Sequence, residues 1–242
     1  MRVDILGVAF DDIVMDEAVD RALAMLEEAR PHLVATPNPE IVQRANQDPE
    51  FAGILSNADL VVPDGVGIIY ASRILGRPLK ARVPGIDLAS NLLARIAGTG
   101  RRLFLLGAAP GVAEQAAVNL QTAYPGLMVC GAHDGYFKED GPVADAIREA
   151  RADVVFVCLG APKQEKWIAA NGEAAGARLY IGLGGALDVF AGKAERAPEG
   201  FQKLGLEWLY RLIKEPSRIG RMSKLPLFLV SAVMARARKS GQ

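Results

Sequence analysis

Short apolar runs alternate with amphipathic stretches along most of this 242-residue chain. Each run has Gly, Pro, Asn or Asp at or next to its end, which is typical of a buried strand that leads into a turn. The stretches between them repeat apolar residues at helical spacing. The runs cover residues 32–38, 58–65, 102–108, 127–135, 153–162 and 178–185, and the helical stretches include 40–55, 111–124 and 142–152.

Continuous apolar strands that alternate with helices predict an α/β fold with a mostly parallel sheet, covered by helices on both faces. In such sheets ligands bind outside the carboxyl ends of the strands. Polar and glycine residues gather at those ends here, so the sequence predicts one cleft. The alternative for each residue is ordinary turn chemistry. The residues concerned are Thr36, Asn38, Asp64, Gly107, His133, Asp134, Lys163, Gln164, Gly184 and Gly185.

Three motifs have the composition of a phosphate or nucleotide site, although each is weak alone. Gly107 and the following Pro-Gly open a helix, but the spacing is neither a dinucleotide fingerprint nor a Walker A loop. Lys163 and Gln164 stand at the start of another helix, where lysines oppose the helix dipole unless an anion or water compensates. The glycines at 182–185 leave room for a ligand or for close packing, and Asp188 follows them.

Two aspartates are candidates for a general base, because each directly follows a buried-type strand. Asp64 lies in VVPDGVGI, and Asp134 lies in GAHDGYF beside His133. An Asp-Gly pair is also a common turn, and the residues alone do not rank one aspartate above the other. Asp87 is interpreted as a helix cap or a salt-bridge partner.

Metal and redox chemistry find little support in the sequence. The two histidines are far apart, and no Cys-x-x-Cys, His-Glu-x-x-His or Asp-x-Asp motif is present, so we expect neither a metal nor a cofactor. Cys130 and Cys158 lie in apolar runs and are interpreted as buried structural thiols in a reducing cytosol. We expect no secretory signal and no membrane-spanning helix.

Charge is divided unevenly, although the formal net charge is zero. Residues 211–242 carry +7, and the remaining residues carry −7. The tail therefore favours an anionic partner: phospholipid, diphosphate or nucleic acid. Its cations are interleaved with apolar residues between 225 and 234, which suits a membrane interface better than nucleic acid. We divide the chain into an α/β core, 1–210, and a basic amphipathic helical appendage, 211–242.

Eight motifs follow one another over about residues 36–221: TPNPEIV, PDGVGI, RVPGIDL, LFLLGAAPGVAE, GAHDGYF, VCLGAPKQEKWI, GLGGALDVFAGKAERAP and GLEWLYRLIKEPSR. Together they resemble the WecG/TagA/CpsF glycosyltransferases. The resemblance implies a Rossmann-like core with a C-terminal appendage. It also implies an inverting, metal-independent transfer from a UDP-sugar, typically UDP-N-acetylmannosamine or its uronic acid. The acceptor would be a polyprenyl-diphosphate-linked sugar in cell-surface polysaccharide synthesis.

The resemblance assigns roles to single residues. It implies that Asp64 is the general base, a choice that the residues alone leave open. It implies that Thr36, Asn38, Arg82 and Gln164 line the pocket. Arginines of the appendage would reach the lipid diphosphate, and the best matches are Arg211, Arg218 and Arg221.

Two rival functions stay open at this point. One is a nucleotide-sugar epimerase or dehydrogenase on the same fold class, against which the missing G-x-G-x-x-G counts. The other is a membrane-docked protein that binds a nucleotide or lipid without turnover. The expected partners are a UDP-sugar, a lipid-linked acceptor and the anionic inner face of the cell membrane, with a homo-oligomer left open and no nucleic acid.

Overall fold

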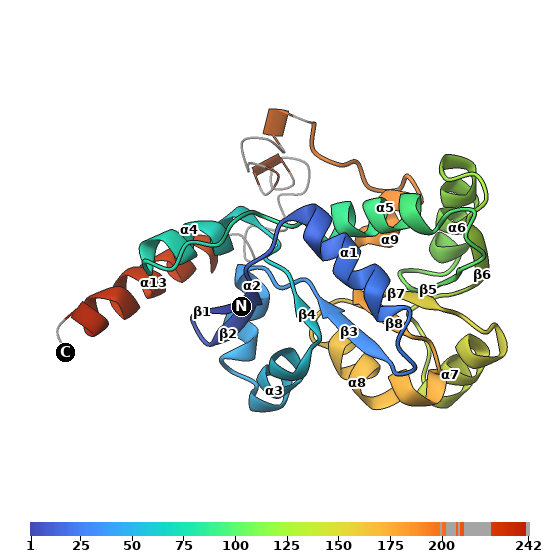
Figure 1. Ribbon diagram of the computed structural model, residues 1–242, viewed down its shortest axis with the longest axis horizontal. Helices are drawn as coiled ribbons and strands as arrows, with labels where there is room; N and C mark the ends of the chain where they lie inside the picture. Colours follow the sequence, from blue (N-terminus) through green and yellow to red (C-terminus); the bar gives the residue numbers. More distant parts are fainter. Residues whose placement is uncertain (199, 202–206, 208, 211–223, 241–242) are drawn as a thin grey trace.

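The structure is a computed structural model that describes residues 1–198, 200, 201, 207, 209, 210 and 224–240. A six-stranded parallel sheet with helices on both faces stands beside a two-stranded antiparallel hairpin (Figure 1). The predicted α/β fold class is therefore confirmed.

The order of elements alternates strand and helix through most of the chain. The strands are β1 (Arg2–Ile5), β2 (Val8–Asp11), β3 (His32–Ala35), β4 (Leu60–Val61), β5 (Arg102–Gly107), β6 (Met128–His133), β7 (Val154–Cys158) and β8 (Leu179–Gly182). The helices are α1 (Met15–Met25), α2 (Pro39–Ala45), α3 (Pro49–Asn57), α4 (Val66–Ile74), α5 (Gly85–Ile96), α6 (Val112–Ala123), α7 (Asp140–Glu149), α8 (Lys163–Ala175), α9 (Ala186–Phe190) and α13 (Lys224–Ser240).

Each of the six predicted apolar runs supplies one strand of the large sheet, in the spatial order β4-β3-β8-β7-β5-β6. The chain moves outward from β5 to β6 on one side and from β7 to β8 on the other. The topological switch point therefore lies between β5 and β7, where Gly107 pairs with Cys158. In open α/β sheets the crevice at this point is the usual place for a ligand.

The sheet is buried on both faces. Figure 1 shows α1, α5, α6 and α9 over one face and α7 and α8 over the other. Strand β7 illustrates why its sequence reads as a continuous apolar run rather than as an alternation. Val154, Phe156 and Cys158 pack into the core under α1, α5 and α6. Val155 and Val157 point the other way, into the core under α7 and α8.

The helical stretch predicted at 40–55 forms two helices, because proline restarts the helix in its middle. Pro49 lacks the N–H needed inside a helix, but it fits the first turn of α3. Asn38 and Asp48 cap the two helices, and each side chain accepts a hydrogen bond from a backbone N–H at 3.1 Å.

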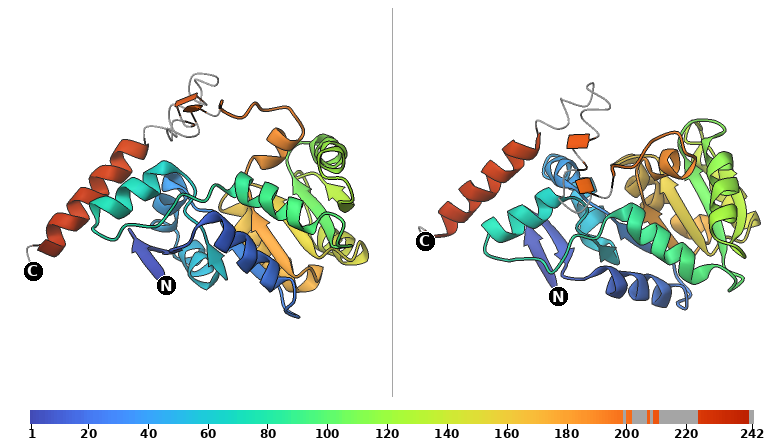
Figure 2. Two further views of the ribbon diagram at one scale, coloured as in Figure 1. Left: turned by 45° about the horizontal axis from the view of Figure 1, so that its top comes forward. Right: turned by 90° about the horizontal axis from the view of Figure 1, so that it is seen from above.

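A third core joins the hairpin, α2, α3, α4 and the C-terminal helix α13. Figures 1 and 2 show α13 lying along α4. Phe228 and Ala232 of α13 are fully buried in this core. Of the helices that the structure describes, none is long and apolar enough to cross a membrane. The division of the chain at residue 210 stays a prediction.

Candidate functional site

The residues singled out at strand ends lie along one edge of the sheet. Thr36 follows β3, Asp64 comes shortly after β4, and Gly184 and Gly185 follow β8. Because all six strands are parallel, these ends meet at the carboxyl edge. Gly107 and His133 end β5 and β6 at the same edge. The strand ends that carry these residues thus share one edge of the sheet. That the residues line one cleft, and their binding roles, stay predictions.

Thr36 and Gln164 are both attached to the turn that follows β8. The Thr36 hydroxyl donates to the Gly182 carbonyl at 2.7 Å, and the Gly184 N–H donates to Gln164 Oε1 at 2.9 Å. Gly182 has no room for a side chain, because an added Cβ would lie 2.8 Å from Gln164 Nε2. Both polar side chains are buried. The turn is thus held from β3 on one side and from α8 on the other.

Asp64 lies beside the segment that carries Thr36 and Asn38. Its N–H donates to the Pro37 carbonyl at 3.2 Å. The next residue, Gly65, is so close to Asn38 that an added Cβ would lie 3.6 Å from the Asn38 Cβ. Asp64 is half-buried, as a general base at a cleft edge would be. Asn38 uses its Oδ1 as a helix cap, which leaves its amide hydrogens for another partner.

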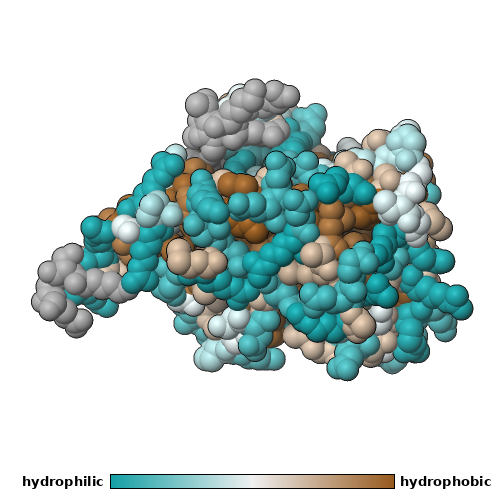
Figure 3. Space-filling view, in the orientation of Figure 1, coloured by the Kyte–Doolittle hydropathy of each residue, from teal (hydrophilic) through white to brown (hydrophobic). Residues whose placement is uncertain are grey.

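Arg82 lies in the loop between α4 and α5, which crosses the same region. The Val83 N–H donates to the Pro63 carbonyl at 2.9 Å, next to Asp64. Figure 3 shows apolar surface exposed between these two helices. Arg82 Nη1 is 2.8 Å from Glu207 Oε2, and the other oxygen of Glu207 is 3.7 Å from Arg196 Nε. One carboxylate therefore stands between two guanidinium groups.

His133, Asp134 and Lys163 form a second group at the turn after β6. Asp134 Oδ1 accepts a hydrogen bond from the Tyr136 N–H at 2.7 Å, which is typical of an Asx turn. Lys163 Nζ donates to the Gly135 carbonyl at 3.1 Å and lies 4.7 Å from the centre of the Phe137 ring. These contacts support the turn interpretation of Asp134.

Comparison with known proteins gives one family. The chain matches the profile of the WecG/TagA/CpsF glycosyl transferase family over residues 3–242. The chain belongs to this family. Similar proteins include an N-acetylglucosaminyldiphosphoundecaprenol N-acetyl-beta-D-mannosaminyltransferase of Bacillus spizizenii strain W23, 38% identical over 90% of this chain and 84% of the relative. An enzyme of the same name from Staphylococcus aureus strain MW2 is 37% identical over 97% of this chain and 93% of the relative.

Membership makes this protein a glycosyltransferase and confirms the predicted enzyme class. Asp188 lies in α9, close to Cys158 at the end of β7. Burial raises the pKa of the Cys158 thiol, and the negative charge of Asp188 raises it further. An added Cβ at Gly185 would be 3.7 Å from Asp188 Oδ2. Asp188 therefore lies between the turn that follows β8 and the end of β7, the strand that borders the switch point.

Three residues near the candidate site were not among the site residues predicted from the sequence. Glu165 resembles an ordinary acid in the first turn of a helix, yet it is only 1% exposed. Glu207 and Arg196 are distant in sequence from Arg82, and no spacing pattern connects them. Arg196 Nη2 also lies 2.6 Å from Asp87 Oδ1, which confirms Asp87 as a salt-bridge partner.

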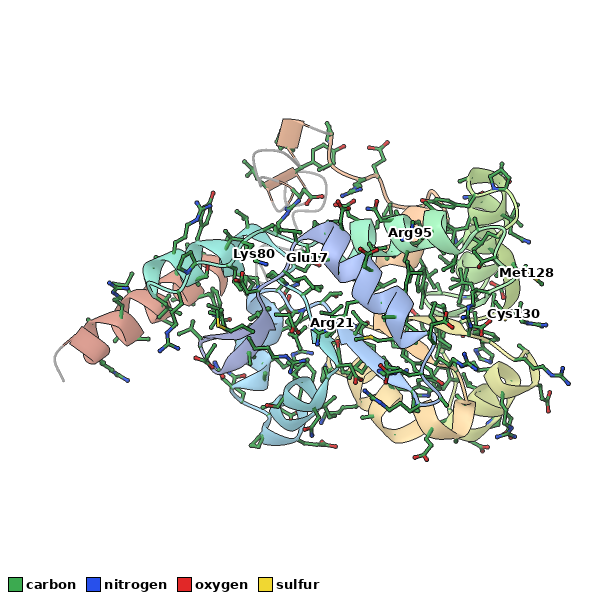
Figure 4. The ribbon with its side chains drawn as sticks, viewed as in Figure 1. Glu17, Arg21, Lys80, Arg95, Met128 and Cys130 are labelled. Atoms are coloured by element: carbon green, nitrogen blue, oxygen red, sulfur yellow. The ribbon has the colours of Figure 1, made fainter. Side chains whose placement is uncertain are left out.

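The cysteines behave as structural thiols in the described part of the chain. Burial raises the pKa of the Cys158 thiol to about 12, and burial also raises the pKa of the half-buried Cys130. A raised pKa disfavours the nucleophilic thiolate. Figure 4 shows Cys130 beside Met128 on β6, across the molecule from Lys80 of the α4–α5 loop.

Two parts of the predicted site remain, the expected absence of a metal and the arginines of the appendage. Among the described residues, no three His, Cys, Asp or Glu side chains are grouped so that they could hold a metal ion. The proposed diphosphate ligands Arg211, Arg218 and Arg221 lie outside the described residues. Their role stays a prediction.

Proposed function

We propose that this glycosyltransferase moves N-acetylmannosamine from a UDP-sugar to the N-acetylglucosamine of an undecaprenyl-diphosphate-linked acceptor, with inversion and without a metal. The observation that carries the proposal is the similarity to enzymes named for this transfer, which covers at least nine tenths of the chain. The gathering of Asp64, Asn38, Thr36 and Arg82 around one edge of the sheet supports it, because donor and acceptor must meet at one place.

In the proposed mechanism Asp64 accepts the proton of the acceptor hydroxyl. The hydroxyl oxygen forms a bond to the anomeric carbon as the bond between that carbon and the UDP phosphate oxygen breaks on the opposite face. UDP leaves with the bonding electrons, and its added negative charge needs nearby cations. Arg82 is the candidate cation, because its side chain is 20% exposed and lies in the loop next to Asp64.

We further propose that the enzyme works at the inner face of the cell membrane, to which α13 attaches it. Leu227, Val230, Val233 and Met234 of α13 are more than half exposed, and Arg236 and Arg238 are exposed near them. A helix that shows apolar and basic side chains together favours an anionic lipid surface.

The test is transfer by the purified protein. UDP-N-acetylmannosamine and a short-chain lipid diphosphate N-acetylglucosamine are supplied, and both UDP release and the disaccharide product are measured. Asp64→Asn should lower turnover by about 10²-fold or more while UDP binding changes little, because general-base catalysis contributes about 10²–10⁴-fold. Asp134→Asn is the matched control and should retain turnover. UDP binding without any turnover by the wild-type protein would reject the proposed activity.

A further inference from the structure

A buried carboxyl group stands next to Gln164 at the start of α8. Glu165 is 1% exposed and Gln164 is 2% exposed, although both lie in the first turn of a helix whose neighbouring lysines reach the surface. A buried acid is costly unless it is paired or neutral. Burial raises the pKa of Glu165, which favours its neutral form. The contacts of the Glu165 carboxyl group indicate what this buried acid does.

Glu165 contacts the side-chain amide of Gln164. Gln164 Nε2 donates to Glu165 Oε1 at 2.8 Å. On its other side, Gln164 Oε1 accepts the hydrogen bond from the Gly184 N–H at 2.9 Å. Two consecutive hydrogen bonds thus connect the Glu165 carboxyl, through the Gln164 amide, to the backbone of the turn after β8. We call this hydrogen-bonded chain the relay.

The relay specifies one orientation of the Gln164 amide. A glutamine amide has donors at one end and an acceptor at the other, and either end fits the same space. Rotating it by half a turn would set the Gln164 oxygen against Glu165 Oε1 and the NH₂ group against the Gly184 N–H. Without Glu165, only the bond to Gly184 would remain to select the orientation.

The turn at the end of this relay, Gly182–Gly185, is rich in glycine and is held in place by side chains from neighbouring elements. Gly184 has a φ of +56°, and Gly185 is exposed at the carboxyl edge of the sheet. Thr36 holds the turn at Gly182 from the β3 side, so Gln164 supplies the anchor from the α8 side. A turn rich in glycine has many alternative conformations, and each residue that must be fixed during binding costs free energy.

We propose that Glu165 is a positioning residue: by orienting Gln164 it holds the Gly182–Gly185 turn in the shape that receives the nucleotide-sugar donor. The identity of the donor rests on the proposed function. The effect falls on donor binding, since a turn that is ordered beforehand spares that cost when the donor arrives. The same turn serves bound substrate and transition state, so kcat changes less than KM.

The experiment compares four variants with the wild-type enzyme. Glu165→Met and Glu165→Ala both remove the acceptor, and they do so with different volumes. Glu165→Gln keeps an oxygen that can accept from Gln164 Nε2. Tyr180→Phe is the matched control for stability. The Tyr180 hydroxyl donates to the Gly172 carbonyl at 2.7 Å and so anchors the same helix without touching the turn.

Three quantities are measured: the KM for the UDP-sugar, the Kd for UDP by calorimetry and the hydrogen exchange rate of the Gly184 amide. We expect Glu165→Met and Glu165→Ala to raise KM and Kd by about tenfold, the size of ordering one backbone residue, with kcat within about threefold. The Gly184 amide should exchange faster in both. Glu165→Gln should restore all three values. Tyr180→Phe should lower Tm and leave them unchanged.

Two outcomes would overturn the proposal. One is an unchanged UDP Kd and Gly184 exchange rate in both Glu165→Met and Glu165→Ala. The other is the same rise of KM in Tyr180→Phe, which would make the effect one of general stability. UDP binding and exchange do not require turnover, so a wild-type protein that binds UDP without transferring sugar would reject the proposed function and leave this test intact.

Discussion

The C-terminal helix α13 offers a sharp test of how the basic tail is organised, through the substitution Phe228→Ala. Phe228 is fully buried in the core formed with α2, α3 and α4. Leu225 of the same helix lies so close to Gly67 of α4 that an added Cβ at Gly67 would be 2.5 Å from it. Side chains this closely packed indicate that α13 belongs to the folded unit.

The size of the effect follows from burial. Removing a fully buried phenylalanine ring costs about 3–5 kcal/mol. For a domain of this size each kcal/mol shifts Tm by roughly 2–4 °C, so Phe228→Ala should lower Tm by about 6–20 °C. The measurement is thermal and urea unfolding of the full chain.

Val230→Ala is the control, because Val230 is in the same helix but is 54% exposed. Its expected effect lies within about 0.5 kcal/mol. Equal stability of Phe228→Ala and Val230→Ala would refute the docking of α13. Docking also changes the design of a membrane test. Truncation of the tail would uncover the core, so substitutions on the exposed face of α13 separate lipid binding from folding.

Three further predictions concern charge. Transfer should survive EDTA, and loss of activity that Mg²⁺ or Mn²⁺ restores would contradict metal independence. Burial raises the folded-state pKa of Glu165 above its usual 4.5, so wild-type stability should fall as pH rises from about 4.5 through that raised pKa. The Tm of Glu165→Gln should not show this fall between pH 4.5 and 8, and parallel Tm curves would contradict it. Glu207→Gln should tighten UDP binding by on the order of tenfold, because it removes the carboxylate that pairs with Arg82, while Arg196 keeps its pair with Asp87. Weaker binding would show that Glu207 instead orients Arg82.

Local pattern was sufficient to predict the large sheet but not the hairpin beside it. Strands that are buried on both faces have continuous apolar sequences, and few other structures require such sequences. For this reason all six strands could be predicted. The hairpin strands Arg2–Ile5 and Val8–Asp11 are short and mix apolar with charged residues. The hairpin is held by long-range contacts. The buried Asp11 pairs with Arg2 and Arg21 and accepts a hydrogen bond from the Val61 N–H at 2.9 Å.

The candidate site likewise contains residues that local sequence indicates and residues that only tertiary contacts reveal. Thr36, Asp64, Gln164 and Gly184 could be proposed from the sequence, because each is an unusual residue at or just after the end of an apolar run. Glu165 was not found, since its sequence position is that of an ordinary helix-start acid and only tertiary packing buries it. The ion pairs of Glu207 with Arg82 and Arg196 join three separate segments of the chain, so no local spacing could have predicted them.

The apolar run of the tail shows how geometry resolves what composition leaves ambiguous. In sequence, residues 225–235 are one apolar block among cations, and the block alone fits either a lipid surface or the protein core. As a helix it turns Phe228 and Ala232, four residues apart, toward α2 and α4. Leu227, Val230 and Met234 recur at helical spacing on the exposed side. The docked side fixes the helix on the enzyme, and the exposed side is then free for lipid. The proposed membrane attachment and the packing on the core would therefore use different faces of one helix, so the two do not exclude each other.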